Sequence, residues 1–185
     1  MSVRTIVTLP EPILRRKARP VTEFDQNFQV LVDDMIETMR AAPGVGLAAS
    51  QVDVPARLIV VEYAEEDDVE GQVAELQADA PPRPKPERKL YVVANPEIVK
   101  ASAETVVGVE GCLSIPTLVG EVERNEVVHV RGLNRRGRPV KIKAEGWLAR
   151  IFQHEIDHVN GIVFTDRATR VWRPEPEDME LEERV

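Results

Sequence analysis

Residues 151–161, IFQHEIDHVNG, contain two of the chain's three histidines. His154 and His158 are four positions apart, and Glu155 directly follows the first of them. On an α-helix this spacing places both imidazoles on one face, where together they can bind one metal ion. The stretch therefore raises the question of which other residue completes the metal site.

The two histidines lie on the apolar side of the helix that this stretch predicts. After Gly146, one broad stripe of the helical wheel collects Trp147, Leu148, Ile151, Phe152, His154, Glu155, His158 and Val159. Burying two imidazoles and a carboxylate side by side is costly unless something binds them. The pattern therefore predicts an interior helix that holds a metal ion.

Candidates for the third ligand lie on both sides of the helix. In zincin-type proteases this ligand follows the motif as His or Glu, but no histidine lies downstream here, and the nearest carboxylates are Asp157 and Asp166. Upstream, the segment EGCLS contains Cys112, the only cysteine of the chain. A thiolate binds borderline-soft divalent metals strongly. We therefore predict a site of Cys112, His154 and His158 with a fourth position open to water, as in catalytic sites.

The segment GVGLAASQ, residues 44–51, is a further candidate part of the site. Its Gly-x-Gly follows a predicted helix rather than a strand, which is the wrong context for dinucleotide binding. The glycines instead favour a loop that another backbone can approach closely, followed by small alanines and the amide of Gln51. Such a loop would suit an extended peptide lying against the site.

Length and composition limit the class of protein. The 185 residues fit one domain with a hydrophobic core, and the formal net charge of −8 argues against a general nucleic-acid binder. Neither the first residues nor any later stretch has an apolar run that fits a signal peptide or a membrane span. A lone cysteine also excludes an internal disulfide. We expect a cytoplasmic protein that does not bind membranes.

Hydrophobic periodicity predicts the main elements. Apolar residues at helical spacing predict an amphipathic helix over residues 25–42. Strands are predicted over residues 57–63, 89–98, 125–133 and 138–144. The last two flank NRRG and form a predicted hairpin, in which we interpret His129 as a partly exposed strand residue.

Two segments differ in composition from the rest of the chain. Residues 64–88 are first acidic and then rich in proline, which predicts a solvated insertion rather than a domain boundary. The last residues are acidic with two prolines. We predict a single catalytic domain over residues 1–170 and a weakly ordered acidic tail over residues 171–185.

GVGLAASQ, EGCLS and QHEIDH resemble, in their order and spacing, the three signature motifs of the peptide deformylase family. The early PEPILRRKA and the later GIVF also fit, so the resemblance runs from about residue 5 to residue 168. It implies an α+β fold of antiparallel β-sheets packed around a central metal-binding helix. It also implies removal of the formyl group from the N-terminal formylmethionine of new proteins, which releases formate. The family's ion is Fe²⁺, one per chain, for which Zn²⁺, Ni²⁺ or Co²⁺ can substitute.

The resemblance assigns the catalytic roles. Cys112, His154 and His158 would hold the metal, which acidifies its bound water. Glu155 would take the proton of that water and pass it to the leaving amine. The backbone N–H of Leu113 would donate to the formyl oxygen.

Further contacts with the substrate are implied in the same way. The side-chain amide of Gln51 would be the second donor to the formyl oxygen. Val45 and Gly46 would pair with the backbone of the peptide as an added strand does. The methionine side chain of the substrate would occupy an apolar pocket near the metal-bearing helix.

A few positions call for separate predictions. Ser50 stands where proline is common in the family and Val159 where leucine is common, and we expect both to be tolerated. Arg150 stands where some members carry an apolar pocket residue, and we favour a solvated guanidinium over one that reaches the pocket. Glu110 and Arg124 match family positions that pair and brace the Cys112 segment.

The expected partners are formylmethionyl nascent chains. We expect a monomer that binds no nucleic acid by itself. A transient ribosome contact is a further expectation, although the acidic tail differs from the basic C-terminal helix through which some members dock. Two other functions stay open: a metalloprotease with the same helix motif, and a non-catalytic protein with a closed metal site. Glu155 and Gln51 argue against the closed site, which would need neither.

Overall fold

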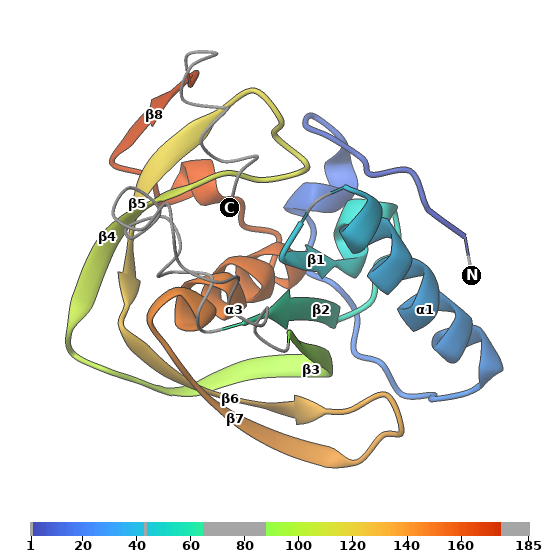
Figure 1. The fold of residues 1–185 in the computed structure, drawn as a ribbon. Coiled ribbons are helices and arrows are strands. Elements are labelled where there is room, and N and C mark those ends of the chain that lie inside the picture. Colours follow the sequence, from blue (N-terminus) through green and yellow to red (C-terminus); the bar gives the residue numbers. More distant parts are fainter. Residues whose placement is uncertain (1, 43, 65–87, 175–185) are drawn as a thin grey trace, which may run out of the picture.

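The computed structural model describes residues 2–42, 44–64 and 88–174. These residues form two helices, α1 and α3, with short 3-10 helices and two antiparallel β-sheets (Figure 1). The larger sheet has the strand order β1-β2-β3-β6-β7 and the smaller one β4-β5-β8. The helices are α1 (Gln26–Ala41), α3 (Gly146–Val159), η1 (Pro12–Arg15), η2 (Ala49–Val52) and η3 (Phe164–Asp166). The strands are β1 (Gly46–Ala48), β2 (Leu58–Tyr63), β3 (Lys89–Ala101), β4 (Thr105–Glu110), β5 (Val119–Asn125), β6 (Val127–Leu133), β7 (Pro139–Glu145) and β8 (Arg170–Trp172).

Helix α3 lies between the two sheets and carries the metal-binding motif (Figure 1). Phe152 and Ile156 pack from α3 into the core cluster that includes the larger sheet. Burying each such side chain contributes about 2 kcal/mol relative to leaving it exposed. The predicted α+β architecture, with antiparallel sheets around a central helix, is confirmed.

Strand β2 is buried on both of its faces. Ile59 and Val61 point into the core cluster with α3, whereas Leu58 and Val60 belong to the cluster with α1. The two helices therefore cover opposite faces of the sheet at β2. This explains why residues 58–61, LIVV, are a continuous apolar run rather than an alternating one.

Helix α1 begins where the sequence predicts it. Asp25 is its N-cap, and its side chain accepts a hydrogen bond of 2.9 Å from the backbone N–H of Phe28. Such a cap is worth about 1 kcal/mol. Val32, Met35 and Met39 are fully buried on the inner face of the helix.

The predicted strands are confirmed, with one extension. β3 runs to Ala101, beyond the predicted end at residue 98, and β6 and β7 form the predicted hairpin. His129 is partly buried in β6, opposite Lys143 of β7, as its interpretation as a strand residue requires. The sequence reasoning did not predict β1, β4, β5 and β8. The segment 44–51, expected to be a loop, contains β1 and most of η2.

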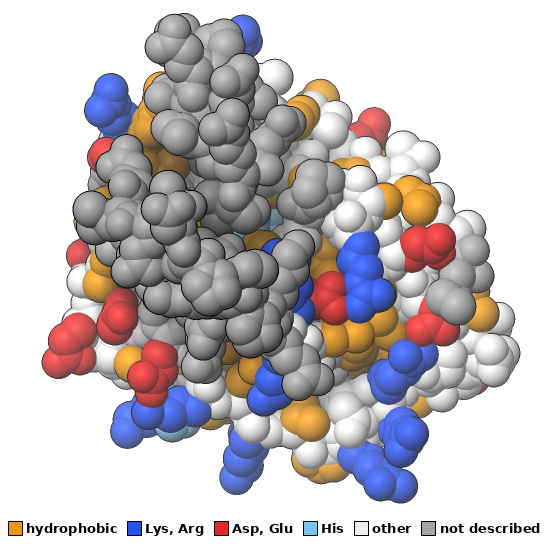
Figure 2. All heavy atoms as spheres, in the orientation of Figure 1, with side chains coloured by type: hydrophobic (Ala, Val, Ile, Leu, Met, Phe, Trp, Pro, Cys, Tyr) orange, Lys and Arg blue, Asp and Glu red, His pale blue; other side chains and the backbone are white. Residues whose placement is uncertain are grey.

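Most of the predicted insertion and tail lies outside the described residues, which exclude residues 65–87 and 175–185. Val171 and Trp172, the first residues of the predicted tail, lie in β8 and pair with β5. Much of the acidic excess of the chain falls in the two segments that are not described. Lysine and arginine side chains gather along the lower border of Figure 2, where Figure 1 places β6 and β7. Among the described residues, no helix is long and apolar enough to cross a membrane.

Candidate metal centre and active-site cavity

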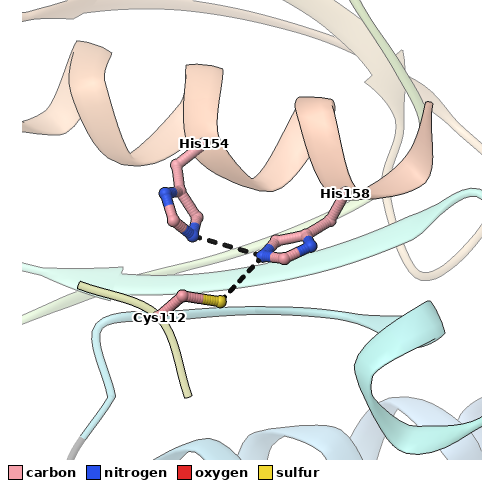
Figure 3. Close-up of side chains that lie close together, drawn as sticks. All are labelled: Cys112, His154 and His158. Carbon is pink, nitrogen blue, oxygen red and sulfur yellow. Dashed lines mark hydrogen bonds between the residues drawn. The ribbon is translucent and has the colours of Figure 1, made fainter. Parts of the chain in front are cut away.

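Three side chains with metal-binding atoms converge between α3 and the segment that follows β4 (Figure 3). Nε2 of His158 lies 3.2 Å from Sγ of Cys112 and 3.2 Å from Nε2 of His154. One ligand atom from each residue lies within 4.8 Å of the other two. The tertiary structure thus brings the predicted Cys112, His154 and His158 together.

The donor set fits a divalent cation. One thiol and two imidazole nitrogens at these separations can surround one ion at the usual distances of about 2.0–2.3 Å. Burial lowers the pKa of His154, but Cys112 and Glu110 outweigh it and raise that pKa to about 10. Burial and the neighbouring His154 lower the pKa of His158 well below its usual value. The neighbours of His154 thus favour positive charge at its imidazole, and a bound metal ion would bring positive charge to the same place.

Glycine ends the motif for a steric reason. Gly161 follows α3 with φ of +78°, and a Cβ there would lie 2.8 Å from the backbone of Arg15. Any larger residue would be strained and would push away the N-terminal segment that packs on the end of α3. The glycine of HVNG thus fixes the place where the helix stops.

A buried carboxylate orients His154. Oε2 of Glu110 lies 3.0 Å from Nδ1 of His154, so Nε2 of this imidazole faces the metal-binding group. Arg124 donates to both oxygens of Glu110, at 2.8 and 2.9 Å. Burial raises the pKa of Glu110, but the hydrogen bonds from Arg124 and His154 outweigh it and lower that pKa to about 2. The predicted pair of Glu110 and Arg124 is therefore present, and its carboxylate contacts His154, a candidate metal ligand.

The two downstream carboxylates that a metalloprotease could use have other partners. Asp157 accepts hydrogen bonds from Arg124 and from Arg167, the latter through both carboxylate oxygens. Asp166 pairs with Arg15 and accepts from the backbone N–H of Val163. The metalloprotease alternative is therefore not favoured. The sequence reasoning missed Arg167 as the partner of Asp157, because no motif around Arg167 indicates this contact.

The expectation that Arg150 is solvated is wrong. Arg150 is only 6% exposed and is one of the residues that line the cavity described below, and its guanidinium donates to Glu110 and to backbone carbonyls of β4 and β5. We expected solvation because a charged guanidinium is costly to bury without partners. In this fold the smaller sheet covers that side of α3 and supplies the acceptors.

Glu155 is buried beside the metal-binding group without being part of it. The residue is 4% exposed, and its Oε2 has no hydrogen-bond partner among the described residues. Burial raises the pKa of Glu155 to about 7. A Cβ on Gly46 would collide with this carboxylate, so glycine at position 46 leaves room for it. A carboxyl group that exchanges its proton near neutral pH suits general acid–base work.

The side chain of Gln51 is fixed at both ends. Its Oε1 accepts a hydrogen bond of 2.8 Å from the backbone N–H of Ala48. Its Nε2 lies 3.6 Å from Sγ of Cys112 and 3.3 Å from Oγ of Ser114. The amide N–H groups are thereby directed toward the metal-binding group. Ser114 belongs to the EGCLS motif, but the sequence reasoning assigned it no role.

A cavity of about 580 Å³ opens beside these groups. It is lined by the predicted site residues Val45, Gly46, Gln51, Cys112, Leu113, His154 and Glu155. Apolar side chains, among them Val109, Leu118, Trp147 and Ile151, form another part of its wall. The cavity therefore offers space for an apolar side chain next to the reacting groups, which a closed structural metal site would not need.

Comparisons with known proteins agree with this geometry. The family model described as polypeptide deformylase matches residues 3–173. A peptide deformylase of Symbiobacterium thermophilum is 51% identical over 183 residues, which are 99% of this chain and 74% of that protein. One of Halothermothrix orenii is 46% identical over 171 residues, 92% of this chain and 97% of that protein.

Solved structures give the same result. The peptide deformylase of Thermotoga maritima superposes with a TM-score of 0.75 at 37% identity, covering 92% of this chain and 100% of that one. The enzyme of Ehrlichia chaffeensis in complex with actinonin gives 0.76 at 38% identity, covering 100% of this chain and 96% of that one. The sequence match over nearly the whole chain and the shared fold show that this chain belongs to the polypeptide deformylase family.

Proposed function

We propose that the chain removes the formyl group from the N-terminal formylmethionine of nascent proteins and that Fe²⁺ is its metal. The observation that carries the proposal is the group of Cys112, His154 and His158 at the edge of a cavity that Glu155 and Gln51 also line. A divalent metal held by these three ligands supplies Lewis acidity toward water and toward a carbonyl oxygen. The other steps fall to residues of the chain.

Glu155 moves the proton. Its buried carboxylate accepts a proton from the attacking water as the water oxygen adds to the formyl carbon. It then delivers this proton to the nitrogen as the bond between the formyl carbon and nitrogen breaks. The products are formate and a free N-terminal amine. The lack of a hydrogen-bond partner for Glu155 Oε2 among the described residues leaves this oxygen available for the transfer.

Gln51 and Leu113 stabilise the developing negative charge on the formyl oxygen. The Nε2 amide of Gln51 is held near Cys112 before substrate binds, and such preorganised donors are each worth about 3 kcal/mol of barrier. The backbone N–H of Leu113, next to the ligand Cys112, is the second donor. Val45 and Gly46 line the same cavity and would pair with the peptide backbone in extended form.

The direct test is release of free Met-Ala, with formate as the other product, from formyl-Met-Ala; the control substrate is acetyl-Met-Ala, which would give Met-Ala and acetate. We expect release only from the formyl peptide, because the cavity must place the small formyl group between Gln51 and Glu155. Cleavage of internal peptide bonds without formate release would favour the metalloprotease. A tightly bound metal with neither activity would favour the closed, non-catalytic site.

The choice of metal follows from the ligands. One thiolate and two neutral imidazoles leave a net charge of +1 with a divalent ion, and a thiolate beside iron can be oxidised. Cys112 lines the cavity and is therefore accessible to oxidants. We expect high activity with Fe²⁺ in the absence of oxygen and progressive loss in air. Ni²⁺ or Co²⁺ should give comparable activity that is stable in air.

Zinc should give a stable but slower enzyme, because it is satisfied with tetrahedral coordination and admits a further ligand reluctantly. The measurement is formate release per bound metal for each form, prepared from one batch of apoprotein. Equal turnover with zinc and iron, and iron activity that air does not affect, would contradict the argument from ligand charge and leave the ligand assignment intact.

The remaining proposals concern partners. We propose that the chain works as a monomer in the cytoplasm on formylated nascent chains, and that any ribosome contact is transient. Residues of one chain bring the candidate metal-binding atoms together beside the cavity, so the proposed site needs no residue from a second copy.

A further inference from the structure

Arg150 connects helix α3 to both long strands of the smaller sheet. It lies one helical turn before His154, and its Nη2 donates to the carbonyl of Val106 in β4 at 2.7 Å. Its Nη1 donates to the carbonyl of Val122 in β5 at 2.8 Å and to Oε1 of Glu110 at 2.9 Å. A charged side chain with this many buried acceptors is held in one conformation.

We propose that Arg150 is a positioning residue for the reaction. Through Glu110 it holds the metal ligand His154, and through the backbone of β4 and β5 it holds one wall of the cavity. The proposal deepens the function proposed above and rests on its site assignment. It extends the support of the metal centre beyond the pair of Glu110 and Arg124.

The route to the metal ligand passes through a shared carboxylate. Oε1 of Glu110 accepts from both Arg150 and Arg124, and its Oε2 faces Nδ1 of His154. Hydrogen bonds from two guanidinium groups fix this carboxylate, so that its Oε2 stays opposite Nδ1 of His154 and Nε2 of that imidazole faces the metal-binding group. Without Arg150, Glu110 loses one of its charged donors and His154 loses part of its orientation.

The route to the cavity wall passes through β4. Within the described part of the chain, β5 is the only strand that pairs with β4, and Arg150 supplies donors to the carbonyls of β4. A Cβ on Gly108 would lie 2.8 Å from the guanidinium, so this glycine makes room for Arg150. The guanidinium carbon also lies 5.6 Å from the ring centre of Trp147, and both Trp147 and Val109 of β4 line the cavity. Arg150 therefore fixes apolar wall residues as well as a metal ligand.

The first experiment compares Arg150→Met with the control Arg131→Met. Methionine keeps an unbranched apolar stem and removes the guanidinium, whereas Arg131 is an arginine of β6 whose side chain is 60% exposed and pairs only with Glu97 among the described residues. Each variant is loaded with Ni²⁺ and mixed with EDTA at a temperature well below its unfolding midpoint. We expect Arg150→Met to release nickel about tenfold faster than the parent, the usual scale for a lost group behind a ligand. It should also show a severalfold higher KM, and the control should match the parent.

A double-mutant cycle separates the two routes. In a Glu110→Gln background, the effect of Arg150→Met on nickel release should shrink to less than about twofold, because its route to His154 is already broken. Its effect on KM should persist, since the carbonyls of Val106 and Val122 are unchanged. The proposal would be overturned if the effects of the two substitutions on nickel release were additive. It would also be overturned if Arg150→Met lowered the melting temperature while nickel release and KM stayed at the parent values, since Arg150 would then be a structural residue.

Arg150→Lys decides the matter if the methionine variant or Glu110→Gln does not fold. Lysine keeps a charge for Glu110, but one ammonium cannot serve both strands as the planar guanidinium does. We expect nickel release within about threefold of the parent together with a raised KM. Release about tenfold faster, or a parental KM, would overturn the proposal. Nickel release needs no catalytic turnover, so a chain that binds nickel normally but releases no formate would refute the proposed function and not the role of Arg150 behind His154.

Discussion

Replacing Glu155 with glutamine should lower the rate of formate release by about a hundredfold or more and leave the metal bound. General acid–base catalysis typically contributes a factor of about 10² to 10⁴, and glutamine keeps the shape of the side chain but cannot accept the proton of water. The metal should stay because the ligand atoms belong to Cys112, His154 and His158. The measurements are kcat from formate release and metal content per chain.

Glu97→Gln is the matched control for this variant. Glu97 is an exposed glutamate of β3 that pairs with Arg131 at 2.7 Å, far from the cavity lining. We expect its activity to equal that of the parent. If Glu155→Gln kept most of its activity, another group would have to move the proton. If it lost the metal instead, Glu155 would be a ligand and the three-ligand assignment would be incomplete.

Replacing Cys112 with serine should weaken metal binding by about 100-fold or more. A serine hydroxyl is a poor ligand near neutral pH because it remains protonated, whereas a metal keeps a thiolate deprotonated. Losing a ligand should cost more than the roughly 10- to 100-fold that follows from losing a group behind one. Competition with a chelator of known affinity measures the change.

Alkylation of the parent protein tests the same assignment without a mutation. Cys112 is the only thiol of the chain and lines the cavity, so iodoacetamide reports on it alone. It should label the apoprotein quickly and the metal-loaded protein slowly, with the denatured chain giving the value for full labelling. Equal rates with and without metal would show that Cys112 is not a ligand and that the third ligand lies elsewhere.

Local patterns in the sequence were sufficient to predict the elements whose buried residues form one stripe, as in a helix, or a continuous run, as in a strand buried on both faces. The stripe of α1, the continuous apolar run of β2 and the paired histidines of α3 each show in a short window. Burial repeats with the period of the helix or the strand, and so it leaves a local pattern. The three motifs also identified the family, because their order and spacing are properties of the sequence alone.

Strands β4 and β5 left a weaker local pattern. Val106, Val107 and Val109 of β4 are all exposed by more than 40%, so their side chains do not alternate between core and solvent. The strand is held by its pairing with β5 and by the hydrogen bonds from Arg150 to its carbonyls. Interactions of the backbone with distant residues leave little trace in the sequence of the strand itself.

The sequence by itself determined the helix that carries both histidines, and it predicted the thiol and the candidate residues of the reaction, because each carries its chemistry in its own side chain. The tertiary structure alone decided how these groups are held. Cys112 and His158 are 46 positions apart, and only the packing of α3 between the two sheets brings their ligand atoms to 3.2 Å. The same packing buries Arg150, which we had expected to be solvated. Its hydrogen-bond acceptors come from β4 and β5, and the sequence of α3 gives no information about them. Burial of a charge depends on partners from other parts of the chain, and those partners are set by the fold.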